Sequence, residues 1–293
     1  MNKSCPHCSA FSRRFGSYKR KVDGVKVQRY QCIQCKKTFS DQSCALTFRW
    51  RKLAFNQLIF DLLSEGNSLN GIARILETKY ETVVRRLVRY ADFGRKFVSQ
   101  MIRQKSFQVS YCQFDELESF EHTKCKPLTV GIAVEAGSRL ILASSVGKIA
   151  AKGHLAEISR KKYGPRPCER KRVLNEMAAE LQNCCDEKTE FITDQSKHYP
   201  RIMREYFPRS KHTAVKGRRG CVVGQGELKA IGFDPIFSLN HTYAMLRDRI
   251  KRLTRRTWTT TKVIARLKDC IDVYAWYHNQ RILFQKKPSL ENH

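Results

Sequence analysis

Two pairs of cysteines near the start of the sequence have a spacing that suits a metal ion. Cys5 and Cys8 form one CxxC pair, and Cys32 and Cys35 form a second. Four thiolates arranged in this way can surround Zn²⁺ tetrahedrally. The alternative, a redox CxxC, would need a thioredoxin-like βαβ context, which is absent around these cysteines. The spacing therefore predicts a zinc site made by these four residues.

A second set of candidate ligands is acidic. The stretch "CQFDELESFEH" (112–122) gathers Asp115, Glu116, Glu118 and Glu121, and "FITD" ends at Asp194. Two carboxylates on adjacent strands can hold divalent ions roughly 3.5–4 Å apart, which align the attacking and leaving oxygens on one phosphorus. Hard oxygen ligands suit Mg²⁺ or Mn²⁺. The alternative is a polar strand end with no ligand role.

Side-chain alternation along a strand separates these acids. Glu116 should point to the other face of the strand from Asp115, which makes it a weaker ligand candidate. Glu118 and Glu121 could simply be solvated. We therefore expect Asp115 and Asp194 to hold the catalytic metal.

The charge of the chain indicates its partner. The 293 residues carry 56 Lys and Arg against 27 Asp and Glu, a formal net charge of +29. Such an excess favours a polyanion such as DNA, although a ribosome-associated or merely soluble basic protein would look similar. No window has 18 uncharged apolar residues, and the N-terminus lacks the apolar core of a signal peptide. We expect a cytoplasmic, nucleoid-associated protein without a membrane partner.

Two small N-terminal domains are predicted before the acids. Residues 1–48 read as a zinc ribbon, with two short strands joined by a turn at Asp23-Gly24. Residues 49–105 read as a helix-turn-helix DNA-binding domain, in which Ser68 caps one helix. The last helix should place its DNA-binding arginines on an outer face: Arg85, Arg86 and Arg89. Any small helical bundle shows similar periodicity.

Residues 106–293 have the element order of an α/β domain. We expect three antiparallel strands, a helix, a strand ending at Asp194, a helix, a strand and two further helices. This order matches an RNase H-like fold, in which Asp115 lies on the first strand and Asp194 ends the fourth. The Pro-rich segment 160–172 is predicted to be a basic loop.

The two C-terminal helices have distinct faces. The first should bury Leu246, Ile250 and Leu253, and the second should bury Ile264, Leu267, Ile271 and Tyr274. The opposite face of the first carries the predicted phosphate-binding residues Arg247, Lys251, Arg252, Arg255 and Arg256.

Taken together, the motifs resemble a known family. The order "CPHC…RYQCIQCKKTFS", "FDELESF", "FITDQSKHYP" and "LNHTYAMLRDRIKRLTRRTWTTTK" looks like bacterial insertion-sequence transposases of the DDE class, of the insertion-sequence-one type and relatives. The resemblance covers nearly the whole chain. It implies an enzyme that cuts the ends of its element and joins them to target DNA, and that works as a homo-oligomer on paired ends.

One position departs from that family. Its third acid opens the final catalytic helix, where this sequence has Asn240; some related transposases have Asn there. Glu227 in the preceding loop is a rival third carboxylate, and Asn240 could be a helix N-cap with no catalytic role. Two other functions therefore stay open: a DNA-binding regulator with a degenerate catalytic domain, and an RNase H-like nuclease that cuts without joining.

Overall fold

The chain forms two compact units. The computed structural model describes residues 3–21, 23–43, 45–48, 50, 52–104, 106–216, 228–229, 232–254 and 259–285. Contacts divide the chain after Leu58, with Met1–Leu58 in the first unit and Ile59–Pro288 in the second. The domain borders predicted at 48/49 and 105/106 stay predictions. Within the described parts of the chain, none of the helices could cross a membrane.

The first unit is built on a small antiparallel sheet. Its strands pair in the order β1-β2-β3: β1 (Ser12–Lys19), β2 (Lys26–Cys32) and β3 (Thr38–Ser40). The turn between β1 and β2 places Gly24 at φ +72°, a conformation that glycine adopts at little cost, so the predicted Asp23-Gly24 turn is confirmed. Among the described residues, one buried cluster holds Cys5, Tyr30, Cys32 and Phe39, and Val27 and Leu46 are buried as well. So small a core needs another source of stability.

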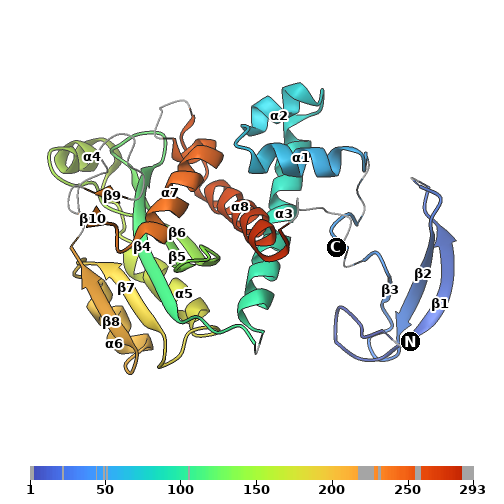
Figure 1. Ribbon diagram of the computed structural model, residues 1–293. Helices are drawn as coiled ribbons and strands as arrows, with labels where there is room; N and C mark the ends of the chain where they lie inside the picture. The colour runs from blue at the N-terminus through green and yellow to red at the C-terminus, as the bar shows by residue number, and fades with distance from the viewer. Residues whose placement is uncertain are drawn as a thin grey trace. The chain divides into compact units, whose positions relative to one another are not determined.

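A five-stranded mixed sheet organises the second unit, in the order β6-β5-β4-β7-β8 (Figure 1). The first three strands in sequence form an antiparallel meander, whereas β7 and β8 run parallel to β4. The bounds are β4 (Tyr111–Phe120), β5 (Pro127–Glu135), β6 (Ile141–Lys148), β7 (Glu190–Asp194) and β8 (Lys211–Val215). A short hairpin follows, β9 (Leu228–Lys229) and β10 (Gly232–Phe233).

Helices cover both faces of this sheet. One buried cluster joins β4 to α5 (Arg170–Leu181) and α6 (Tyr199–Tyr206), and a second joins β5 to α7 (Phe237–Arg249) and α8 (Ile264–Phe284). Alternate residues of β5 belong to the two clusters, as expected for a central strand covered on both sides. The predicted buried residues of the two C-terminal helices are confirmed, with Ile264 only partly buried.

Three helices precede the sheet: α1 (Phe55–Ser64), α2 (Leu69–Ile75) and α3 (Tyr80–Ile102). Ser68 caps α2, as predicted, by accepting a hydrogen bond from the backbone N–H of Gly71 at 3.0 Å. The long helix α3 packs closely on α8. A Cβ added at Gly94 would lie 2.6 Å from the backbone oxygen of Asp272, so only glycine permits this approach.

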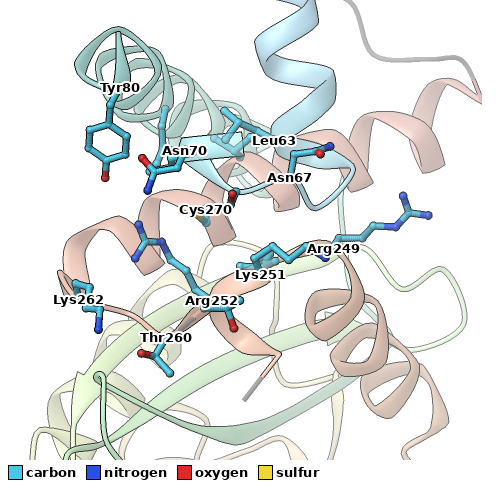
Figure 2. Close-up of a pocket in the computed structure, with 16 residues that line it drawn as sticks. Leu63, Asn67, Asn70, Tyr80, Arg249, Lys251, Arg252, Thr260, Lys262 and Cys270 are labelled. Atoms are coloured by element: carbon cyan, nitrogen blue, oxygen red, sulfur yellow. The ribbon is translucent and has the colours of Figure 1, made fainter. Parts of the chain in front are cut away.

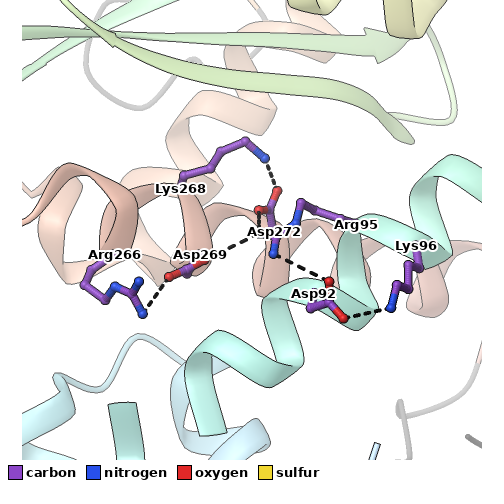
Figure 3. A network of polar contacts seen from close by, with 7 residues as sticks. All are labelled: Asp92, Arg95, Lys96, Arg266, Lys268, Asp269 and Asp272. Atoms are coloured by element: carbon purple, nitrogen blue, oxygen red, sulfur yellow. Dashed lines mark hydrogen bonds and ion pairs between the residues drawn. The ribbon is translucent and has the colours of Figure 1, made fainter. Parts of the chain in front are cut away.

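Ion pairs reinforce the contact between α3 and α8 (Figure 3). Arg95 donates to Asp272 at 2.8 Å and to Asp269 at 3.4 Å, and both carboxylates are buried. Arg266 and Lys268 pair with the same two aspartates from within α8. Buried carboxylates require such partners, so α3 is joined to the C-terminal helix by packing and by charge.

Two predicted boundaries were wrong. Segment 160–172 is mostly helical, because α4 (Leu155–Tyr163) and α5 occupy both of its ends and leave only residues 164–169 as a connection. The helix α7 ends at Arg249, and a 3₁₀ turn η1 (Lys251–Leu253) follows.

Candidate functional site

The four predicted cysteines of the first unit come together. One potential ligand atom from each of Cys5, Cys8, Cys32 and Cys35 lies within 4.8 Å of the others. The Sγ atoms of Cys5 and Cys35 are 3.7 Å apart, and those of Cys8 and Cys32 are 3.4 Å apart. This cluster is close enough to bind a metal ion.

Backbone N–H groups point at two of the four sulfur atoms, and the neighbouring thiols share one charge, which lies on Cys32 while the pKa of Cys35 is raised to about 11. The N–H of His7 points to Cys5 Sγ at 3.4 Å, and that of Cys35 points to Cys32 Sγ at 3.3 Å. Burial opposes ionisation of Cys32, but donors from Cys35, Cys8 and Gln34 lower its pKa to about 6. A thiolate is the form that ligates metals. The imidazole of His7 is not among the clustered ligand groups.

The two predicted aspartates occupy matching positions on neighbouring strands. β4 and β7 pair in parallel, and the last aligned residues are Gln113 and Ile192. Two residues further along each strand are Asp115 and Asp194. Because side chains repeat every second residue, both carboxylates project from the same face as that pair. The two predicted ligands therefore lie next to each other just beyond the last paired residues of β4 and β7, although 78 residues separate them in sequence.

The environment of Asp115 disfavours the charged form of its carboxyl group. Burial raises its pKa to about 6; the charges of Asp194 and Glu116 act in the same direction, and hydrogen bonds oppose them. The hydroxyl of Tyr199 donates to Asp115 Oδ1 at 2.7 Å, and the N–H of Glu116 donates to the same atom at 2.6 Å. No ion pair to Asp115 or Asp194 occurs among the described residues.

The neighbouring glutamates have a different role. Glu116 accepts from Arg170 Nε at 3.0 Å, Glu118 pairs with Lys152, and Glu121 pairs with Arg166 at 3.2 Å. All three basic partners come from the segment around α4. The glutamates therefore anchor that basic segment against β4, and the acid cluster is divided between paired glutamates and an aspartate without a cationic partner.

The start of α7 is fastened to β4 close to Asp115. Gln113, which is buried, donates to the Pro235 oxygen at 3.0 Å and accepts from the Leu239 N–H at 3.0 Å. Asn240 Nδ2 donates to Asp234 Oδ2 at 2.6 Å, and Asp234 is 4 % exposed. This bond uses the amide nitrogen of Asn240, so its Oδ1 atom can still accept a hydrogen bond or coordinate a cation.

The N-cap interpretation of Asn240 is wrong. The cap of α7 is Ile236, and the backbone N–H of Asn240 already donates to the Ile236 oxygen at 3.0 Å. Asn240 is thus the fourth residue of the helix, where its side chain is not needed for capping. The rival ligand Glu227 lies outside the described residues.

One turn further along α7, Tyr243 faces the acidic site. Burial and the charges of Asp115, Glu116 and Asp194 raise its pKa well above the ordinary value for a tyrosine. Its hydroxyl is buried and has no hydrogen-bond partner among the residues that the structure describes. Asn240, Tyr243 and Arg247 are spaced i, i+3, i+7, so they share one face of the helix.

The predicted DNA-binding arginines of α3 are not equivalent. Arg85 is exposed and Arg89 half-buried, but Arg86 is only 6 % exposed, so its predicted place on an outer face is wrong. Position 86 falls on the same side as the buried residues Val83, Leu87 and Tyr90, which explains the burial. Periodicity alone could not separate it from Arg85.

The predicted basic residues after α7 also differ. Arg247 and Arg252 are half-buried and Lys251 is exposed, whereas Arg255 and Arg256 lie outside the described residues. The sequence interpretation missed Tyr199, Asp234 and Tyr243. The only signal for them was proximity to Asp194 and Asn240 along the chain, and that does not distinguish a site residue from a core residue.

Comparison with known proteins gives no independent assignment. No family model and no curated protein matches this chain.

Proposed function

We propose that this protein is a metal-dependent DNA transposase that cuts and joins insertion-sequence ends, with an RNase H-like catalytic domain. The observation that carries the proposal is the matched position of Asp115 and Asp194 on parallel neighbours β4 and β7. The sheet order β6-β5-β4-β7-β8, with β5 antiparallel to its neighbours, supports the fold assignment.

The donor set fits Mg²⁺ or Mn²⁺. Asp115 and Asp194 provide hard anionic oxygens, and neither is neutralised by an ion pair within the described residues. As the third ligand we propose Asn240, whose amide oxygen is neutral and whose helix also carries Tyr243, a neighbour of the aspartates. Mg²⁺, when bound, supplies electrostatic stabilisation of the phosphodiester oxygens and activates the attacking hydroxyl.

The protein's own residues prepare this site. Tyr199 holds one oxygen of Asp115 by a hydrogen bond and so fixes the rotation of the carboxylate. Asp234 fixes the amide of Asn240 in the same way. Because the pKa of Asp115 is raised to about 6, this carboxyl group is protonated below about pH 6, and there cation binding and proton release are coupled.

The other parts of the chain suit binding of the DNA substrate. We propose that the cysteine cluster holds Zn²⁺, which would stabilise the small first unit, and that α1–α3 act as a helix-turn-helix. Of the three predicted arginines of α3, Arg85 is exposed and Arg89 half-buried, so these two are the ones we propose for phosphate contacts. The charge of +29 should make binding fall steeply with salt through counterion release.

The decisive test is cleavage of a plasmid that carries the coding sequence together with its natural flanking DNA. The wild-type protein should nick or cut this plasmid with Mg²⁺ and be inactive with EDTA. Asp115→Ala should abolish cleavage and retain DNA binding, because Asp115 carries no positive charge for the phosphates. Normal cleavage by Asp115→Ala would contradict the proposal.

Two outcomes separate the alternatives. Binding to flanking DNA without cleavage in Mg²⁺ or Mn²⁺ would favour the regulator, which the neutral side chain of Asn240 specifically supports. Cleavage without joined products, when a second plasmid is offered as target, would favour the nuclease.

A further inference from the structure

A pocket in the second unit, away from the aspartate pair, has the chemistry of a ligand site. Its volume is about 310 Å³, at the lower end of the range of roughly 300–1,000 Å³ found for ligand pockets. One wall comes from the end of α1, from α2 and from the start of α3 (Figure 2). The other comes from the end of α7, η1, residues 259–262 and α8.

The pocket is cationic. Arg249, Lys251, Arg252 and Lys262 line it, and its described lining includes no acidic residue. Arg249 is engaged by Glu65 and Asp248. In contrast, within the ranges that the structure describes, Lys251, Arg252 and Lys262 form no ion pair. Three positive charges gathered in a hollow without counter-charge favour an anion with more than one negative charge.

Polar and apolar groups accompany the cations. The amides of Asn67 and Asn70 face the hollow, and Leu63, Leu87 and Val273 supply apolar lining. Tyr80 stands at the rim and is 40 % exposed. In Figure 2, Tyr80 and Asn70 lie on the side opposite Arg252 and Lys262. An inorganic anion would use only the cationic wall, whereas a phosphate with a flat base attached would use both walls.

We infer that this pocket binds one nucleotide, with its phosphate on Lys251, Arg252 and Lys262 and its base towards Tyr80. Aromatic side chains provide stacking surfaces for bases without a strong sequence preference, and charge-assisted hydrogen bonds hold phosphates. The nucleotide could be free or part of a DNA strand. This inference deepens the DNA binding of the proposed function and rests on it only for the choice of a strand as the natural source.

The test is titration calorimetry of the full-length protein at low salt with thymidine 5′-monophosphate, inorganic phosphate and a short oligothymidylate. The pocket variant is Lys251→Ala/Lys262→Ala. Its matched control is Lys161→Ala/Lys171→Ala, which also removes two exposed lysines that form no ion pair. All four side chains are exposed, so neither variant should disturb folding, and thermal melts check this.

The pocket variant should bind thymidine monophosphate or the oligonucleotide about tenfold more weakly, and the control should bind like wild type. If the pocket variant binds both ligands more weakly, the pocket recognises a single nucleotide. If only oligonucleotide binding is weakened, the nucleotide that the pocket binds belongs to a DNA strand. Tyr80→Ala should weaken the nucleotide ligands while leaving inorganic phosphate unchanged.

Equal affinity of the pocket variant and the control for the nucleotide ligands would overturn the inference, as would a loss of inorganic phosphate binding alone. Plasmid cleavage is measured in parallel. A protein that binds nucleotides through the pocket but never cleaves DNA would refute the proposed function and leave the pocket assignment standing.

Discussion

The cysteine cluster and the proposed aspartate site are assembled in different ways. The cysteines lie on two short CxxC turns joined by one small sheet, and all four ligands are of one type. The aspartates lie on strands β4 and β7, and their register depends on the pairing of a five-stranded sheet. The first set brings four strong ligands together, whereas the second has two carboxylates, to which we propose that Asn240 adds a neutral amide.

The surroundings of the two sites predict how much each contributes to the stability of the fold. Among the described residues of the first unit, two of the four cysteines, Cys5 and Cys32, belong to its small buried cluster, so the candidate zinc ligands are also part of its core. The aspartates border large apolar clusters that hold the sheet without them. Loss of a cysteine should therefore damage structure, and loss of an aspartate should damage chemistry.

The largest expected effect is that of Cys32→Ser. Because structural zinc contributes on the order of 10 kcal/mol to small domains, this change should unfold residues 3–48 and remove about one equivalent of zinc. Metal analysis and hydrogen exchange of the full-length protein would measure this. Cys168→Ser, at an exposed cysteine outside the cluster, is the control and should retain the metal. Full zinc content in Cys32→Ser would show that Cys32 is not needed to hold the metal, and the contrast between the cysteine and aspartate sites would be lost.

Asp194→Ala should have the next largest effect. Loss of a metal ligand removes several kcal/mol of transition-state stabilisation, so cleavage should fall by about 1,000-fold while zinc content and DNA binding stay unchanged. Plasmid nicking with Mg²⁺ is the measurement. Glu121→Gln is the matched control, because its carboxylate pairs with Arg166 and is not a proposed ligand, so cleavage should stay near the wild-type rate. Similar losses in both variants would argue against a special role for Asp194.

Asn240→Ala should reduce cleavage by roughly 10- to 100-fold, since an amide oxygen compensates less charge than a carboxylate. Asn240→Glu should retain or alter cleavage without unfolding the protein, because the side chain is half-buried and caps no helix end. Asp234→Asn tests the positioning of the amide and should produce a smaller loss. If Asn240→Ala cleaves like wild type, a residue outside the described ranges, such as Glu227, becomes the third ligand.

The smallest effect concerns stability. The pKa of Asp115 in the folded protein is about 6, above the ordinary value for a carboxyl group. Folding therefore favours its protonated form, and this contribution is complete below about pH 4 and lost as the pH rises through 6. At pH 7 in EDTA, Asp115→Asn should stabilise the protein by about 1–3 kcal/mol, seen as a higher Tm.

The gain in Tm from Asp115→Asn should shrink as the pH is lowered from 7 to 4. Cys32→Ser should never stabilise the protein, at any pH. A lower Tm for Asp115→Asn at pH 7 would mean that the carboxylate supports the fold, which would remove the contrast between the two sites.

Local patterns in the sequence determined a good part of this protein. The CxxC spacing defined the cysteine cluster, because its ligands lie on short turns whose geometry depends on few neighbours. Apolar residues repeated every two or every 3.6 positions located β4, β7, α7 and α8. The buried face of a strand or helix recurs at that interval along the chain. Asp115 and Asp194 could be named because each lies on a predicted strand, although their register was not visible in either stretch.

Only the tertiary structure decided which charged groups are neutralised and which helix faces are buried. The sequence alone does not reveal that Glu116 pairs with Arg170, that Arg86 points inward, or that Asp234 holds the Asn240 amide. Each of these depends on elements that meet only after the sheet and its covering helices have packed. The strength of an electrostatic interaction is set by separation in space and by local burial, and neither quantity is encoded in the spacing of residues along the chain.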